Sequence, residues 1–133
     1  MPNHNKVVCL DVGEKRIGVA VGDRIIRIAS KLPTIEVNGN EISEIAKIIT
    51  DEDAETLVIG YPRNQSGETT NQTKFVEEFA KKLTGIANNV VFQDESLTSV
   101  IAEQQLKSYN RPYSKGDIDA QAAAIILHDY LEA

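Results

Sequence analysis

Hydrophobic residues in this chain follow two patterns, which predict strands in some segments and helices in others. Short apolar runs rich in β-branched residues are typical of buried strands. Two such runs, at residues 7–10 and 16–21, are separated by a turn at 13–15, and this spacing predicts a two-stranded antiparallel hairpin. Three further runs predict strands at residues 25–29, 56–59 and 90–92.

Helices are predicted where apolar residues recur every three or four positions. The first is at residues 41–49; the second begins after Thr69 or Thr70 and ends before Gly85. A third is capped by Thr98, and the last covers residues 118–131. The resulting order of strands and helices is typical of an α/β fold, with a mixed five-stranded sheet flanked by helices on both faces. Such a sheet places its ligand site beyond the strand ends.

A length of 133 residues without repeats or linkers predicts a single domain over residues 1–133. The composition, 41% hydrophobic and 26% charged, is that of a globular protein. No apolar run reaches the roughly 18 residues that span a bilayer, and residues 1–6 lack the apolar stretch of a signal peptide. We therefore expect a cytoplasmic protein with no membrane partner. The single cysteine, Cys9, excludes an internal disulfide and a thiolate-rich zinc site.

The charge of the chain is acidic, with 14 basic and 20 acidic residues and a net charge of −6. Proteins that bind nucleic acid are typically basic, although local clusters rather than the total charge decide where a ligand binds. Four acids concentrate in residues 51–55. This block has two interpretations, a contact with another protein or a solvated helix end.

Three acids stand where a core-forming sequence avoids them: Asp11 and Glu95 follow buried strands, and Asp119 lies in the first turn of the last predicted helix. Each also has a structural interpretation, as a turn residue, a solvated group or a favourable charge at a helix N-terminus. If the strand ends are neighbours and the helix packs over them, the three carboxylates converge. Oxygen-only ligands favour Mg²⁺ or Mn²⁺, and two such ions can support hydrolysis of a phosphodiester.

Several sequence blocks in a fixed order resemble a known family over nearly the whole chain. They are residues 11–23, 60–67, 94–98, 115–119 and 122–127. These blocks closely resemble the YqgF family, also called RuvX or Holliday junction resolvase-like proteins. The resemblance implies an RNase H-like fold and a nuclease, with a role in maturing the 5′ end of pre-16S rRNA. The acidic triad of the family corresponds to Asp11, Glu95 and Asp119, as catalytic residues and metal ligands.

Basic and polar residues in or beside these blocks are candidate contacts to nucleic acid. The candidates are Lys15, Arg16, Arg63, Asn64, Thr98 and Lys115. Cations there would contact phosphates, and the loop 60–67 would present backbone N–H groups to a phosphate oxygen. The alternative interpretations are ordinary surface charge, a turn between strand and helix, and helix capping by Thr98.

The chain departs from the family pattern at three positions. Ser96 stands where an arginine is expected, which removes a cation beside the proposed metal site. Tyr61 and Arg63 stand where apolar residues are more frequent. Arg63 therefore partly replaces the basic group that is missing at position 96. Only Lys115 precedes the last motif, where relatives often carry several basic residues.

The first functional hypothesis is a two-metal nuclease, using Mg²⁺ or Mn²⁺, that acts on structured RNA or branched DNA. The second is a non-catalytic module that binds RNA or ribosome-assembly factors, which the acidic charge and Ser96 favour. A third, a nucleotide-binding relative of actin-like ATPases, is disfavoured because those proteins enclose a nucleotide between two such domains. The sequence leaves open RNA against DNA, endo- against exonuclease, the metal preference, and monomer against homodimer.

Overall fold

The protein forms a mixed sheet packed between helices, in a computed structural model that describes residues 5–63, 66–95 and 98–133. The strands are β1 (Lys6–Val12), β2 (Arg16–Asp23), β3 (Ala29–Glu36), β4 (Thr56–Pro62) and β5 (Asn89–Glu95). The helices are α1 (Glu41–Glu52), α2 (Asn71–Lys82), α3 (Thr98–Ser108) and α4 (Lys115–Glu132). This order of elements is the one that the sequence predicts.

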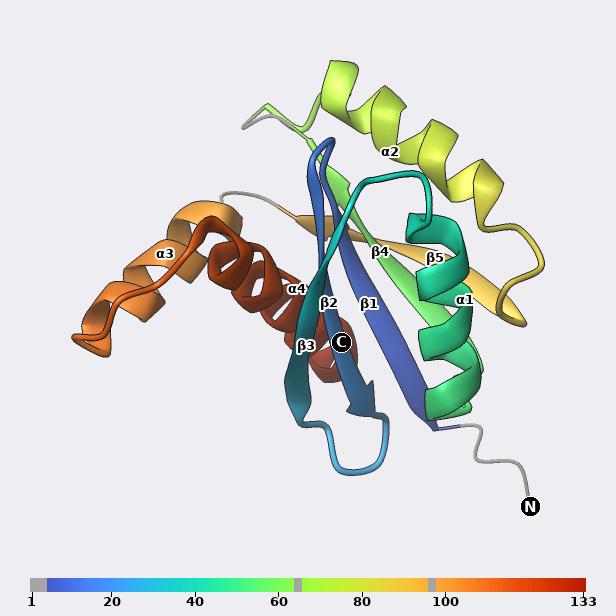
Figure 1. Cartoon of the computed structure of the whole chain (residues 1–133), viewed down its shortest axis with the longest axis horizontal. Coiled ribbons are helices and arrows are strands. Elements are labelled where there is room, and N and C mark those ends of the chain that lie inside the picture. The colour runs from blue at the N-terminus through green and yellow to red at the C-terminus, as the bar shows by residue number, and fades with distance from the viewer. Residues whose placement is uncertain (1–4, 64–65, 96–97) are drawn as a thin grey trace.

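The five strands lie in the order β3-β2-β1-β4-β5. The pairs β1–β2 and β2–β3 are antiparallel, whereas β1–β4 and β4–β5 are parallel. The prediction of a hairpin followed by a mixed sheet is therefore confirmed. Because β1, β4 and β5 run in the same direction, their C-terminal ends meet at one edge of the sheet (Figure 1).

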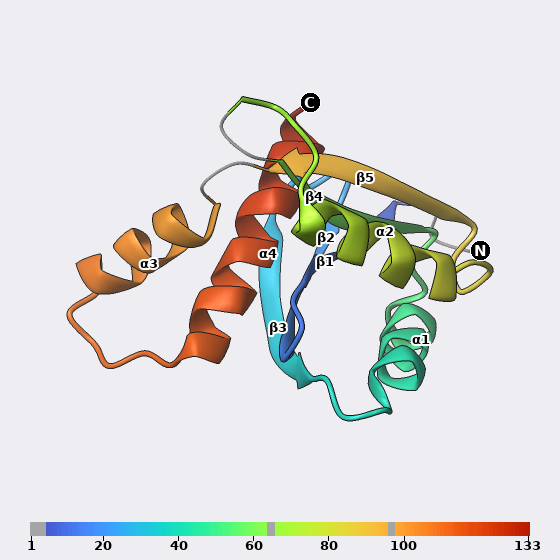
Figure 2. The same cartoon turned by 90° about the horizontal axis from the view of Figure 1, so that it is seen from above.

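Helices cover both faces of the sheet, as Figure 2 shows from above. Successive side chains of a strand point to opposite faces. In β1, Val8 and Leu10 belong to the hydrophobic core shared with α1 and α2, whereas Val7 and Cys9 pack with α4. Asp11 follows Cys9 by two positions, and it therefore faces the α4 side of the sheet.

The strand predicted at residues 25–29 is wrong, because these residues form a turn and β3 begins only at Ala29. Asp23 Oδ1 accepts hydrogen bonds from the N–H groups of Ile25 and Ile26, at 2.7 and 3.2 Å. Arg27 then takes a left-handed conformation with φ of 62°. An aspartate that bonds the following backbone favours a turn over a strand, and it outweighs the β-propensity of the isoleucines.

Capping boxes fix the first residues of two helices, α2 and α4. In α4, the observed start differs from the predicted one, and this changes the helical turn in which Asp119 lies. Thr70 and Thr73 exchange hydrogen bonds at the start of α2, which confirms Thr70 as the cap. Ser114 and Asp117 do the same for α4, so that this helix begins at Lys115. Asp119 consequently lies in the second turn of α4, not in the first, and helix capping does not account for it.

The acidic block at residues 51–55 forms the end of α1 and the residues that follow it. Lys47 pairs with Asp51 at 2.9 Å and Lys6 pairs with Glu52 at 3.6 Å, while Asp53 takes a left-handed conformation that ends the helix. Within the single chain, the block is thus a helix end in contact with solvent and held by two ion pairs. Within the described ranges, no helix is both long enough and apolar enough to cross a membrane.

Candidate active site

A glycine in β2 lets α4 approach the sheet closely enough to bring Asp119 toward β1. Gly18 is the register partner of Asp11 across the β1–β2 ladder. A Cβ atom on Gly18 would lie 1.9 Å from the backbone oxygen of Asp119 and 3.1 Å from the nitrogen of Ala120. No side chain fits this contact. The backbone of α4 therefore rests directly on the strand that neighbours Asp11.

We expect Gly18→Ala to lower the free energy of unfolding by on the order of 3 kcal/mol, because the added methyl group forces α4 away from the sheet. Urea titration followed by circular dichroism measures this change. Gly116→Ala is the matched control, since its nearest neighbour is 3.6 Å away and alanine favours the helix. Equal stability of both variants would contradict the close contact.

A second glycine makes room for Glu95 at the same edge of the sheet. A Cβ atom on Gly60 would lie 3.2 Å from the carboxyl carbon of Glu95 and 2.8 Å from Cδ1 of Ile126. Gly60 lies within β4, together with Tyr61 and Pro62. Gly60 is therefore part of a strand and not of the predicted loop at residues 60–67. Its role is steric, because it lets the Glu95 side chain lie over β4.

Asp11 and Glu95 line one pocket of about 340 Å³ at the C-terminal edge of the parallel strands. Arg63 and Thr98, two of the predicted nucleic-acid contacts, line the same pocket. The Arg63 Nε atom lies 3.3 Å from Asp94 Oδ1, and the guanidinium lies 5.0 Å from the centre of the Tyr61 ring. Arg63 thus lines the pocket of the two carboxylates, while its guanidinium contacts Asp94 and Tyr61.

Both carboxyl groups in this pocket are held in an environment that disfavours their charge. Burial, reinforced by the charges of Glu95 and Asp119, raises the pKa of Asp11 from 3.8 to about 8. Burial also raises the pKa of Glu95, against the opposing effect of a hydrogen bond from the Thr98 side chain. A cation placed between the two groups would remove this penalty.

Asp119 is turned toward a cation of the chain itself. Arg16 Nε donates to Asp119 Oδ2 at 2.7 Å, and both side chains are mostly buried, with exposures of 29% and 22%. Asp119 is near enough to Asp11 to raise its pKa, yet it does not line the pocket. In residues 5–63, 66–95 and 98–133, no three acidic, histidine or cysteine side chains are arranged to hold one metal ion together.

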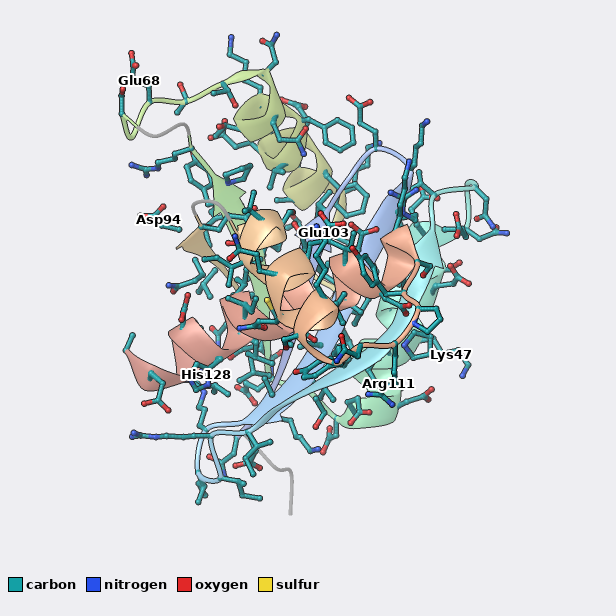
Figure 3. All side chains as sticks on the ribbon, turned by 90° about the vertical axis from the view of Figure 1, so that its left-hand side faces the viewer. Lys47, Glu68, Asp94, Glu103, Arg111 and His128 are labelled. Carbon is teal, nitrogen blue, oxygen red and sulfur yellow. The ribbon has the colours of Figure 1, made fainter. Side chains whose placement is uncertain are left out.

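The other predicted contacts are distributed around this edge. Lys15 is exposed in the turn between β1 and β2, and Lys115 is exposed at the first position of α4. Asn64 and Ser96 lie outside the described residues. His128 is exposed on α4 (Figure 3). It lies some two and a half helical turns beyond Asp119 in the sequence.

Three residues that shape the site were missed by sequence reasoning. Gly18 and Gly60 interrupt strand patterns, and a glycine inside a strand is a signal of close approach by another group. Gln72, at the start of α2, lines the pocket and donates to the backbone oxygen of Val12 at 3.2 Å. No feature of the local sequence indicates this last role, because it depends on how α2 packs.

The strand order, the helices on both faces and the acids at one sheet edge define an RNase H-like fold. Solved structures of this fold include T. thermophilus RuvC in complex with a Holliday junction substrate, which is 13% identical, with a TM-score of 0.59 and 98% of each chain covered. A second *Thermus thermophilus* RuvC structure is 12% identical, with a TM-score of 0.51, and the match covers 95% of this chain and 93% of that one. At these identities the likeness establishes the fold alone.

The chain belongs to the RuvX family, whose model, described as "Holliday junction resolvase", matches residues 5–133. A "Putative pre-16S rRNA nuclease" of Chloroflexus aurantiacus is 40% identical over 136 residues, which cover 98% of this chain and 89% of the relative. A Staphylococcus carnosus protein of the same name is 40% identical over 141 residues, which cover 97% and 96%. The resemblance seen in the sequence blocks is confirmed.

Proposed function

We propose that this protein is a divalent-metal-dependent nuclease that hydrolyses phosphodiester bonds in structured nucleic acid, with Asp11, Glu95 and Asp119 as its catalytic residues. One observation carries the proposal: two carboxyl groups with raised pKa values share a pocket with Arg63. Perturbed acids in a cleft are typical of functional sites. The names of the RuvX relatives support pre-16S rRNA or a Holliday junction as the substrate.

The donor set fits Mg²⁺ or Mn²⁺, because it consists of carboxylate oxygens. Asp11 and Glu95 would hold the cation, and Asp119 would join them after Arg16 has released it. When bound, the metal would polarise the phosphodiester and lower the pKa of a water molecule for in-line attack. The proposal includes a second divalent ion, because two such ions would stabilise both the attacking and the leaving oxygen of the phosphodiester.

The remaining residues of the pocket would orient the substrate. Arg63 would bind a phosphate oxygen near the carboxylates, and Thr98 would hold Glu95 in place through its hydrogen bond. Arg16, freed from Asp119, would become available to a second phosphate. Arg16 would thus pair with Asp119 before the metal ion binds and contact the substrate afterwards.

Arg16→Gln is therefore expected to tighten Mn²⁺ binding by roughly threefold or more, since Asp119 is no longer neutralised. The same change should lower the stability of the metal-free protein by about 1 kcal/mol, because a mostly buried ion pair is lost. Isothermal titration with Mn²⁺ measures the affinity. Lys15→Gln removes an exposed neighbouring cation as the control, and equal tightening in both variants would argue against the Arg16–Asp119 pair as the cause.

A cleavage assay tests the proposed function directly. The purified protein is incubated in Mg²⁺, Mn²⁺ or chelator with a precursor RNA that carries the 5′ end of 16S rRNA and with a four-way DNA junction. Products with a 5′-phosphate that form only with metal support the proposal. The Glu95→Gln variant, purified in parallel, excludes a contaminant. Cleavage that continues in this variant, or none on either substrate, would contradict the proposal.

A non-catalytic module that binds RNA or ribosome-assembly factors is the second candidate, and one observation favours it. Asp119, one of the three proposed metal ligands, is engaged by Arg16. This alternative predicts RNA binding that survives loss of all three acids in metal-free buffer. Binding and cleavage are therefore compared in the wild type and in the Asp11→Asn, Glu95→Gln, Asp119→Asn triple variant. A nuclease loses cleavage in the triple variant, whereas a binding module binds RNA without cleaving it in both proteins.

A further inference from the structure

The most exposed large apolar side chains of the described residues lie together in the turn between β2 and β3. We name Ile25, Ile26 and Ile28 the isoleucine tip; their exposures are 73%, 65% and 62%. This turn lies at the end of the sheet opposite the acids, because Asp23 pairs with Lys6 at the start of β1 and Asp11 lies near its end. Exposed apolar clusters of this kind mark interaction surfaces.

Specific bonds hold the tip in a defined conformation. Asp23 accepts the N–H groups of Ile25 and Ile26, and its backbone oxygen accepts the N–H of Arg27 at 2.7 Å. At the base of the turn, Arg24 donates to Tyr130 Oη at 2.8 Å and to Thr56 Oγ1 at 3.1 Å. The isoleucines are thus presented on an ordered support, which lowers the entropic cost of burying them against a partner.

The same chain carries a groove whose chemistry is complementary to the tip. A cavity of about 510 Å³ lies between β3 and α1. Its apolar lining includes Leu32, Pro33 and Ile48. The rim is acidic: Glu36, Glu44, Asp51 and Glu52 line the cavity, with Lys47 as its cation. An apolar floor with an acidic rim suits an apolar segment that carries a positive charge, as the tip does with Arg27.

We propose that two copies of this chain associate by placing the isoleucine tip of each in the β3–α1 groove of the other. The isoleucines would cover the apolar floor, and Arg27 would face the acidic rim. Direct pairing of β3 edges is disfavoured, because Pro33 has no N–H and the register of β3 against β2 shifts in this region. The contact therefore rests on side chains.

The placement of tip and groove on one edge strand allows both contacts to form at once. The tip directly precedes the N-terminus of β3, and the groove is lined by its later residues, from Leu32 to Glu36. If a two-fold axis relates the two copies, their β3 strands run antiparallel without pairing through backbone hydrogen bonds. Each isoleucine tip then reaches the β3–α1 groove of the other copy.

Sedimentation velocity of the purified full chain tests the association. We expect dimers at about 100 µM protein, and Ile26→Asp should raise the dimer dissociation constant by at least about tenfold, because it places a charge in an apolar contact. Ile101→Asp is the matched control, since Ile101 is 41% exposed on α3, away from both tip and groove. Wild-type protein that is monomeric at this concentration, or equal effects of both variants, would overturn the proposal.

Mixing two variants separates contact of tip with groove from contact of tip with tip. Ile48→Arg changes the groove and should also give monomers, whereas Thr50→Arg, an exposed position on α1 outside the groove, should not. A mixture of Ile26→Asp and Ile48→Arg restores one intact contact, so heterodimers should form. Dimers of Ile48→Arg alone would overturn the proposal. If thermal unfolding shows that Ile48→Arg is misfolded, Glu44→Arg at the exposed rim replaces it.

Discussion

Asp119→Asn is expected to lower phosphodiester cleavage by at least about a hundredfold while the fold is retained. Asparagine has nearly the same shape, so the contact of the α4 backbone with Gly18 is unchanged. It carries no charge, however, and it neither holds a divalent cation as a carboxylate does nor balances Arg16. Single-turnover cleavage in Mg²⁺ and in Mn²⁺ measures the loss.

The control for this prediction comes from the same helix. Asp129→Asn removes an exposed carboxylate of α4, roughly 15 Å along the helix from Asp119, and should leave cleavage unchanged. Circular dichroism spectra of both variants check the fold. A correctly folded Asp119→Asn protein with full turnover would remove this residue from the mechanism, whatever the roles of Asp11 and Glu95.

Asp11→Asn is expected to stabilise the metal-free protein, by roughly 2–4 kcal/mol at pH 8. The folded-state pKa of Asp11 is about 8, above its ordinary value of 3.8. Below pH 3.8 the carboxyl group is protonated in both states and costs nothing. As the pH rises toward 8, the unfolded chain gains stability by ionising Asp11 while the folded protein does not, so stability falls. A neutral asparagine avoids this loss.

Urea unfolding of wild type and Asp11→Asn between pH 4 and pH 8 measures the difference. The two proteins should be equally stable near pH 4, and the curves should separate as the pH rises. Asp129→Asn, whose carboxylate is exposed, should follow the wild type across the whole range. A difference that does not change with pH would mean that packing, not charge, distinguishes the Asp11→Asn protein.

The fold was predictable where local sequence and tertiary packing agree. The hairpin of β1 and β2, the parallel strands β4 and β5 and the cap at Thr70 all follow from short-range patterns. The bounds of the third strand did not follow from such a pattern. The isoleucines at residues 25–28 have the composition of a strand, but Asp23 and Arg27 make this segment a turn. Pairing with β2 selects residues 29–36, although they include a proline.

The candidate site was predictable in its acids but not in its geometry. Asp11 and Glu95 stood out because charged groups directly after buried strands are costly. That Asp119 is paired with Arg16 could not be inferred, since the partners are 103 positions apart and meet only through the approach of α4 to β2. The pattern gave Arg16 as a phosphate contact; the structure adds its bond to a carboxylate.

The close packing of α4 against Gly18 also has a consequence for the synthesis of the protein. Asp11 is synthesised early, in the first strand β1. Asp119 belongs to α4, which begins almost 100 residues after the start of β2. A nascent chain that stops before Lys115 has neither Asp119 nor a cover for Cys9 and Val58. If the three acids act together as proposed, the chain becomes competent to cut RNA only after α4 has been synthesised and has packed against β2.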